Sequence, residues 1–198
     1  MVTVIDYGSG NLKSISNGFL KIGVKPNITN NIEEIVDAKY LVLPGVGAFA
    51  SAMKNIEYFK DIIFEHIESN KPFLGVCLGL QLLFNYSDEN FGIEGLNIFK
   101  GNVKKLPNTE KIPHMGWNNL KLTKNSKILE GLDGKYFYFI HSFHGVPEDD
   151  IITSTVKYGA NLTASVEENN VFATQFHPEK SGSFGLKILK NFISIKNI

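Results

Sequence analysis

The chain has 198 residues, 43% hydrophobic and 20% charged, a composition that fits a globular protein with a buried core. Twenty basic and twenty acidic residues give a net charge of zero, which argues against a strong overall attraction to nucleic acid. All of the basic residues are lysines, so an anion would be bound by lysine, hydroxyl or backbone N–H groups and not by a guanidinium.

The sequence contains one cysteine and shows no targeting or membrane signal. A single thiol cannot form an internal disulfide. The beginning of the chain lacks a basic region followed by a long apolar core, and no apolar run reaches the roughly 20 residues that cross a bilayer. We therefore expect a cytoplasmic protein.

The first half of the sequence alternates short apolar runs with amphipathic segments. One such segment places Leu12, Ile15, Phe19 and Ile22 on one helix face and ends at Gly23. The predicted strands are residues 3–6, 25–29, 38–45 and 72–77, and the predicted helices are residues 11–22, 48–69 and 78–86. Strands that alternate with helices predict a parallel sheet covered on both faces.

After Asp88 the sequence changes to short β-like runs joined by polar turns. These predicted strands are residues 96–107, 118–123, 135–143, 150–159, 162–170 and 171–179, and residues 183–195 are predicted to form a closing helix. No linker separates the two halves. We therefore expect one α/β domain over residues 1–198, with a central, mostly parallel sheet flanked by helices and an additional β-rich region.

The cysteine lies in a short motif that is typical of a nucleophile. Cys77 stands between Gly75 and Gly79, after an apolar run and before a helical one. Such a turn strains the central residue and presents its side chain at the end of the strand, next to a helix N-terminus. The following residue, Leu78, would offer a backbone N–H to an oxyanion. The alternative is a buried cysteine that packs as a small apolar residue.

A cysteine nucleophile needs a base and a group that orients the base. His177 ends an apolar β run, and Glu179 follows two residues later, so both side chains share one face in extended geometry. Pro178 favours that geometry at His177. His66, in contrast, lies in the middle of a predicted helix and is expected at the surface or at an edge.

The histidines of the sequence do not indicate a metal site. His141 and His144 lie close together in the sequence, but no further cysteine or paired carboxylate completes a zinc-like ligand set. We expect no metal and no cofactor.

Six stretches together carry a resemblance to a known family. They are "VIDYGSGNLKSI", "LPGVGAF", "GVCLGLQLLF", "IPHMGWN", "YFYFIHSF" and "FHPEKS". The chain resembles class I (triad) glutamine amidotransferases, and among them the glutaminase subunits of imidazole glycerol phosphate synthase. The likeness extends from about residue 3 to about residue 193, and the motifs occur in family order.

The resemblance implies a role for each matching residue. Cys77 would attack the side-chain amide of glutamine, His177 would transfer protons, and Glu179 would orient His177. The oxyanion would be bound by backbone N–H groups of Val46 or Gly47 and of Leu78, in a loop that is inactive until a partner binds. The substrate-binding residues would be Gly45, Gly47, Gln81, Glu89, Ser142 and Phe143.

The resemblance also implies a partner. Glutaminase subunits of this kind pass ammonia to a (β/α)₈ barrel subunit that makes imidazole glycerol phosphate and AICAR in histidine biosynthesis. The matching positions at such a heterodimer interface are Asn11, His114, Met115, Trp117, Tyr138 and Lys180. Core packing is the alternative role for Met115 and Trp117.

Other functions remained open from the sequence. A paralogous glutaminase could feed ammonia to another synthase, such as one that forms amidino groups on surface sugars. Residues 45–50 match a dinucleotide-binding fingerprint, but at the third strand and without the acidic residue that would bind a ribose. A non-catalytic scaffold and a cysteine hydrolase of another substrate, such as a peptidase, are the other two classes.

Overall fold

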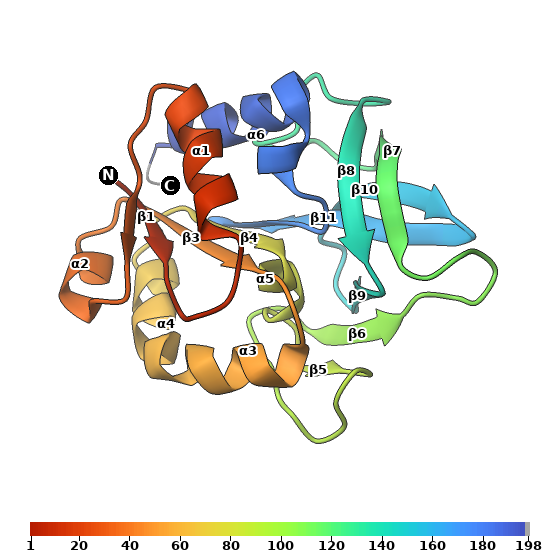
Figure 1. Ribbon diagram of the computed structural model, residues 1–198, viewed down its shortest axis with the longest axis horizontal. Helices are drawn as coiled ribbons and strands as arrows, with labels where there is room; N and C mark the ends of the chain where they lie inside the picture. Colours follow the sequence, from red (N-terminus) through yellow and green to blue (C-terminus); the bar gives the residue numbers. More distant parts are fainter. Residues whose placement is uncertain (197–198) are drawn as a thin grey trace.

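The computed structural model describes residues 1–196 and is built around a nine-stranded sheet (Figure 1). Its strands are β1 (Val2–Ile5), β2 (Asn27–Thr29), β3 (Tyr40–Gly45), β4 (Phe73–Cys77), β7 (His114–Leu122), β8 (Tyr136–His141), β10 (Ile152–Tyr158), β11 (Ala160–Glu168) and β12 (Val171–Thr174). The helices are α1 (Leu12–Lys21), α2 (Ile32–Val36), α3 (Phe49–Ile56), α4 (Lys60–Glu68), α5 (Leu78–Gln81) and α6 (Gly182–Ser194), with 3-10 turns η1 (Glu57–Phe59) and η2 (Pro178–Lys180).

The order of the strands joins the two halves of the chain in one sheet. The order is β2-β1-β3-β4-β12-β11-β10-β7-β8. The pairs from β2 to β12 are parallel, as expected from the strand–helix alternation, and the pairs from β12 to β8 are antiparallel. The predicted β-rich region therefore continues the central sheet. It places β12, from the end of the chain, directly beside β4.

Alternate residues of the parallel strands pack against helices on the two faces of the sheet. In β3, Leu41 and Leu43 belong to the core beneath α3 and α4, which includes Phe49. Val42, between them, belongs to the core beneath α1 and α6, which includes Phe192. This alternation is what a two-sided parallel sheet requires, because neighbouring side chains of a strand point to opposite faces.

A second, three-stranded sheet lies beside the edge at which β4 ends (Figure 1). It contains β5 (Tyr86–Ser87), β6 (Gly101–Lys105) and β9 (Phe143–Pro147). Strand β9 starts two residues after β8 ends, so the chain passes from the large sheet to the small one at Ser142. This junction brings residues 141–143 close to the carboxyl end of β4.

Two helical predictions were wrong in detail, and one short helix was not predicted. The helix predicted over residues 78–86 ends at Gln81, because the chain turns at residues 82–85 to enter β5. The helix predicted over residues 48–69 is divided into α3 and α4 by the turn η1. Helix α2 was not predicted, although Asn31 caps it by accepting a hydrogen bond from the Glu33 N–H at 2.9 Å. In residues 1–196, no helix has the length and apolar character needed to span a membrane.

Helix α6 packs so closely on the turn η2 that one position admits only glycine. A Cβ atom on Gly185 would lie 1.9 Å from the carbonyl oxygen of Pro178 and 2.8 Å from Cβ of Ser181. No real side chain tolerates these distances without a shift of the backbone. Gly185 therefore fixes the position of η2, which carries Glu179.

We predict that Gly185→Ala destabilises the protein. In a free helix this change would stabilise by about 1 kcal/mol, since alanine has the higher helix propensity. Here we expect a loss of about 1–3 kcal/mol, because the added methyl overpacks the contact with Pro178. Chemical denaturation measures the difference, and Ser183→Ala, at an exposed position of the same helix, serves as the control. A gain in stability for Gly185→Ala would contradict the packing described here.

Candidate active site

Cys77 occupies a strained turn at the carboxyl end of β4. Its φ is 57° and its ψ is −105°, a left-handed conformation that a residue with a side chain rarely adopts. The flanking glycines make the turn possible. A Cβ on Gly79 would lie 2.0 Å from the carbonyl oxygen of Leu43, and one on Gly75 would lie 2.8 Å from the carbonyl oxygen of Gly79. The turn expected from the sequence is therefore present, although the Cys77 residue is only 6% exposed.

His177 and Glu179 reach the same place from the neighbouring strand. Strand β12 ends at Thr174, five residues before the end of the predicted strand, so Glu179 lies in the turn η2 and not in a strand. His177 itself is extended, with φ −98° and ψ 99°. The two side chains meet because Pro178 starts a tight turn directly after His177.

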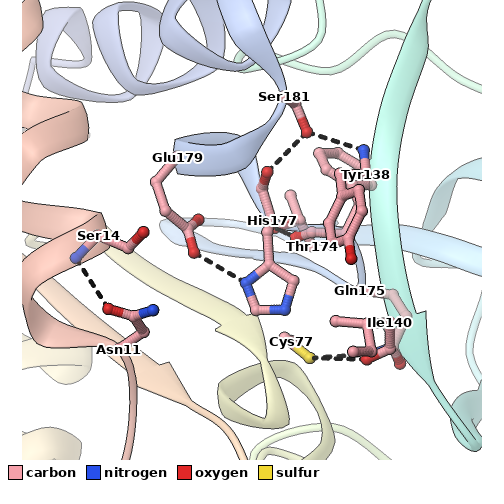
Figure 2. Close-up of polar contacts among 11 residues, drawn as sticks. Asn11, Ser14, Cys77, Tyr138, Ile140, Thr174, Gln175, His177, Glu179 and Ser181 are labelled. Atoms are coloured by element: carbon pink, nitrogen blue, oxygen red, sulfur yellow. Dashed lines mark hydrogen bonds and ion pairs between the residues drawn. The ribbon is translucent and has the colours of Figure 1, made fainter. Parts of the chain in front are cut away.

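The imidazole of His177 lies between the carboxylate and the thiol (Figure 2). Its Nδ1 is 2.8 Å from Oε1 of Glu179, and both side chains are almost fully buried. Among residues 1–196, Nε2 of His177 has no hydrogen-bond partner, and Figure 2 shows this nitrogen on the side of the ring that faces Cys77. A histidine with one nitrogen bound to a carboxylate and the other facing a thiol can move a proton to and from sulfur.

The backbone around His177 is also bound on both sides. The Ser181 hydroxyl donates to the His177 carbonyl at 2.6 Å and accepts from the Tyr138 N–H at 3.0 Å, as Figure 2 shows. The His177 N–H donates in turn to the Tyr138 carbonyl at 3.0 Å. These bonds to strand β8 fix the backbone of His177, and with it the position of the imidazole relative to Cys77.

Opposite charges determine the protonation of His177. Burial by itself lowers the pKa of His177, but the sulfur of Cys77, which faces Nε2, and the hydrogen-bonded carboxylate of Glu179 outweigh burial and raise it to about 10. The imidazole therefore carries a proton at neutral pH when the sulfur and the carboxylate are ionised. Such a pair supplies a thiolate nucleophile together with an acid for the leaving group.

Cys77 forms part of the wall of a cavity of about 370 Å³, a size within the usual range for small-molecule sites. The cavity combines groups from six segments of the chain. Its lining residues are Val46, Gly47, Cys77, Leu78, Gln81, Glu89, Pro113, Ile140, His141, Ser142, Phe143 and Lys180. The structure thus brings together all of the expected substrate-binding and oxyanion residues except Gly45, which lies buried at the end of β3. Pro113, Ile140 and His141 were not predicted to line it.

Gln81 is held by two acceptors within the wall of the cavity. Its Nε2 donates to the Phe143 carbonyl at 3.0 Å and to Oε1 of Gln175 at 3.1 Å. Gln175 donates in turn to Sγ of Cys77 at 3.8 Å. Gln175 was not predicted as a site residue, although its place two residues before His177 puts both side chains on one face of an extended segment.

Glu89 reaches the cavity because it caps helix α3. Its Oε2 accepts the Phe49 N–H at 2.8 Å, and Oδ1 of Asn90 accepts the Ala50 N–H at 3.3 Å. The other carboxylate oxygen of Glu89 is left for a cation such as an ammonium group. The same two bonds occupy the N-terminus of α3, so the dinucleotide-binding interpretation of residues 45–50 loses its phosphate site.

The loop that follows β3 has room to change its conformation. The carbonyl of Val46 accepts a hydrogen bond from the Ser9 hydroxyl at 2.7 Å. Gly47 has φ 104°, and within the described chain a Cβ placed there would meet no atom within 4 Å. A peptide bond beside such a glycine can rotate at little steric cost. Gly45 differs, since a Cβ there would lie 2.6 Å from the Tyr7 hydroxyl.

Four of the six residues expected at a partner interface lie together beside the cavity. Met115 and Trp117 are 60% and 56% exposed, so the core-packing alternative for them is wrong. Trp117 stands opposite Tyr138 across the β7–β8 pair, and their rings are 6.2 Å apart. Nζ of Lys180 lies 5.9 Å from the centre of the Tyr138 ring. Asn11 is exposed and caps α1 by accepting from the Ser14 N–H at 3.0 Å (Figure 2).

Two histidines differ from expectation because they are buried. His114, expected at the interface, is only 2% exposed and is stacked on the ring of Tyr158, with centroids 4.0 Å apart. Its side chain points to the opposite face of β7 from Met115. His66, expected near the surface, is 3% exposed, and its Nε2 is 3.1 Å from the Pro72 carbonyl oxygen. In residues 1–196, no group of three or more His, Cys, Asp or Glu side chains could hold a metal ion.

Known proteins resemble the chain over nearly its full length. The model of the family "Glutamine amidotransferase class-I" matches residues 3–195. The imidazole glycerol phosphate synthase subunit HisH of Methanothermobacter thermautotrophicus is 48% identical, covering 98% of each chain. The subunit of the same name from Methanocaldococcus jannaschii is 47% identical, covering 98% of this chain and 100% of that one. A chain in the structure of PurLQS from Thermotoga maritima superposes with a TM-score of 0.76 at 20% identity, covering 98% of this chain and 97% of that one, and shows the same fold.

We predict that Glu179→Gln lowers the pKa of His177. In the folded protein this pKa is raised to about 10, above the usual value of about 6.5. Protonation of His177 therefore stabilises the fold fully below pH ~6.5, and this contribution is lost as the pH rises through about 10. Removal of the carboxylate charge should lower the pKa by about 1–3 units. NMR titration of the imidazole measures it, with Glu168→Gln at an exposed position as the control. An unchanged titration would show that the carboxylate does not act on His177.

Proposed function

Because the chain belongs to the class-I glutamine amidotransferase family, we propose that Cys77, His177 and Glu179 hydrolyse the side-chain amide of L-glutamine. The enzyme is a glutamine amidotransferase, and residues 1–198 act as one such domain. The observation that carries the proposal is a buried His177–Glu179 pair, 2.8 Å apart, beside a strained cysteine at the wall of a small cavity. A scaffold without chemistry would not need this strain or this buried charge.

In the first half of the reaction, Sγ of Cys77 attacks the amide carbon of glutamine. The carbonyl oxygen becomes an oxyanion, and the backbone N–H groups of Leu78 and of Val46 or Gly47 donate to it. His177 then gives its proton to the amide nitrogen. The C–N bond breaks, ammonia leaves, and a thioester remains on Cys77.

In the second half, water replaces ammonia. His177, now neutral, takes a proton from the water as it attacks the thioester carbon. The C–S bond breaks, glutamate leaves and the sulfur regains its negative charge beside protonated His177. Glu179 keeps the imidazole in one orientation throughout, because Nδ1 stays bound to its carboxylate.

The cavity wall suggests how glutamine is oriented. Glu89 has one carboxylate oxygen left after capping α3, and Gln81 has its Oε1 left after both Nε2 hydrogens are used. These two acceptors suit the α-ammonium group. No arginine exists in the chain, so Lys180 and backbone N–H groups of the loop at Gly47 are the available partners for the α-carboxylate.

The protein is the glutaminase subunit of imidazole glycerol phosphate synthase, which acts in histidine biosynthesis. The two archaeal relatives carry the name of that subunit, and the match covers nearly all of both chains. This level of identity favours histidine biosynthesis over a paralogous role in surface-sugar amidination. Water would dilute free ammonia, so the subunit works within a synthase complex.

We propose a (β/α)₈ barrel subunit as the partner in that complex. The exposed pair Met115 and Trp117 would be its main contact, since large apolar and aromatic side chains dominate interface energies. Trp117, Tyr138 and Lys180 form one continuous surface that ends at the cavity. A partner bound there would cover the site and receive ammonia directly.

We predict that Cys77→Ala abolishes glutamine-dependent synthesis by the complex, by about 10³-fold or more, because no thioester can form. Synthesis with added ammonium salt should stay close to the wild-type rate, since the partner performs that step alone. Both rates are measured by formation of imidazole glycerol phosphate in the reconstituted complex. Loss of the ammonia-dependent rate as well would contradict the role of ammonia supplier.

We predict that Trp117→Ala weakens binding of the partner by about 30-fold or more, as expected for a central aromatic contact. Slow glutamine hydrolysis by the isolated subunit should not change. Titration calorimetry gives the affinity, and Tyr58→Ala, which removes an aromatic residue that is 72% exposed on η1, is the control. Equal losses for both variants would place the interface elsewhere.

A further inference from the structure

A continuous series of hydrogen bonds connects the sulfur of Cys77 with strand β7. It begins at Gln175, whose Nε2 donates to Sγ of Cys77 at 3.8 Å. Oε1 of Gln175 accepts from Gln81 at 3.1 Å, and the same Gln81 nitrogen donates to the Phe143 carbonyl at 3.0 Å. Gln175 is completely buried and Gln81 is 6% exposed, so water does not compete for these bonds.

The series continues through two buried histidines. Nδ1 of His141 is 2.8 Å from the Phe143 carbonyl oxygen, and Nε2 of His141 is 3.0 Å from Nδ1 of His114. Nε2 of His114 lies 3.3 Å from Nδ2 of Asn118, which also donates to the Lys157 carbonyl at 3.0 Å. The series thus runs from the nucleophile to strand β7, which carries Trp117.

Only one arrangement of hydrogens satisfies the whole series. A carbonyl can only accept, so His141 carries its proton on Nδ1 and its Nε2 accepts. His114 must then donate from Nδ1 and accept at Nε2 from the Asn118 amide. Burial lowers the pKa of His114 to about 4 and that of His141 to about 3, so both rings are neutral near pH 7.

Packing fixes the two rings in this arrangement. His114 is stacked between Phe139 and Tyr158, with ring centroids 4.7 and 4.0 Å away. His141 is 5% exposed and borders the cavity. Rotation of either ring would leave a buried donor or acceptor unpaired, which is unfavourable where water cannot replace the lost bond.

We propose that Gln175 stabilises the thiolate of Cys77 by donating its amide N–H, and that His141 and His114 are positioning residues that fix this donor through Phe143 and Gln81. The proposal rests on the proposed function only in that Cys77 is the nucleophile. It assigns a direct contact with the reacting sulfur to a residue outside the triad. It also assigns a role in the glutaminase site to two histidines outside the triad.

The surroundings of the sulfur explain why such a donor matters. Sγ of Cys77 also lies 3.9 Å from the Ile140 carbonyl oxygen, a group that can accept a hydrogen bond from a thiol but repels a thiolate. Figure 2 shows Ile140 and Gln175 on the same side of the sulfur. The amide hydrogen of Gln175 offsets the carbonyl on that side, while protonated His177 attracts the sulfur from the other. Without the Gln81 bond, the Gln175 amide could rotate and present its oxygen to the thiolate.

The first test measures the reactivity of Cys77, the only cysteine, toward iodoacetamide at neutral pH. Gln175→Glu keeps the shape of the side chain but replaces the donor by a carboxylate. We expect alkylation to slow by about tenfold or more, because the negative charge disfavours the thiolate. Gln175→Met removes the donor without adding charge and should slow alkylation less. Equal rates for the wild type and both variants would overturn the role of Gln175.

The second test separates positioning from stability at His141. In His141→Asn the amide can still donate to the Phe143 carbonyl, whereas His141→Leu leaves that carbonyl without this donor. We expect the KM for glutamine to rise about tenfold in His141→Leu, with a smaller change in kcat, and to stay within about threefold of wild type in His141→Asn. His66→Asn, at a buried histidine outside the series, is the control. Equal KM values for the Leu and Asn variants would overturn the role of His141.

A spectroscopic measurement is independent of activity. In the wild-type protein, ¹⁵N NMR should show both His114 and His141 as neutral rings with the proton on Nδ1. In His114→Leu the Phe143 carbonyl should keep the proton of His141 on Nδ1, but Nε2 of His141 loses its donor, so the ¹⁵N signal of Nε2 should shift downfield. An unchanged Nε2 signal would show that the two rings are not hydrogen-bonded. The outcomes also separate the two proposals. Absence of glutamine hydrolysis in the wild type, with the alkylation differences intact, would reject the glutaminase function but not the hydrogen-bond series.

Discussion

The site depends on the turn at Cys77, which is possible only because Gly75 and Gly79 carry no side chain. Helix α5 starts directly after Cys77, so the chain must reverse within one residue while it stays close to β3. The distance of 2.0 Å between a Cβ on Gly79 and the Leu43 carbonyl shows how close this approach is. The backbone strain of this turn lies at Cys77, which adopts φ 57°. In return the sulfur stands where β4 ends, next to the backbone N–H of Leu78 and the free nitrogen of His177.

His177, the proposed base, is held in place in a different way. His177 and Glu179 lie outside any strand, so their positions depend on the turn η2 and on what packs against it. Helix α6 contacts η2 at Gly185, α1 contacts it at Gly18, and Ser181 connects it to β8. Three elements from distant parts of the chain thus fix one ion pair. This explains why two buried charged groups remain in place although their desolvation is costly.

The sequence predicted the features that depend on local pattern. Apolar runs and their alternation with helices indicated the parallel strands, and the glycines around Cys77 indicated the turn. The motifs identified the family and therefore which histidine we propose as the base. The features that were missed depend on tertiary contacts. The sequence near His114 does not show that its ring will be stacked on Tyr158, which comes from another strand. The sequence near His66 does not show that its ring will be buried and bonded to the carbonyl of Pro72.

Element ends were also predicted less well than elements. The apolar run after Gln81 continues the helical pattern, but residues 82–84 are buried by the small sheet, where the chain must turn to enter β5. The run before His177 continues the β pattern, but β11 pairs with β12 only as far as Thr174. In both cases the end of the element depends on the neighbouring strands. The sequence of the segment alone does not show which strands will lie beside it.

The pairing of β4 with β12 has a consequence for the order in which the site can form. Cys77 and His177 are separated by one hundred residues of sequence, yet Cys77 ends β4 and His177 lies just beyond the end of β12, the parallel strand beside it. During synthesis on a ribosome, the cysteine is made long before its base. A nascent chain therefore holds an inactive thiol until its last segment inserts beside the fourth strand. The proposed nucleophile and the proposed base thus come together only when β12 has paired with β4.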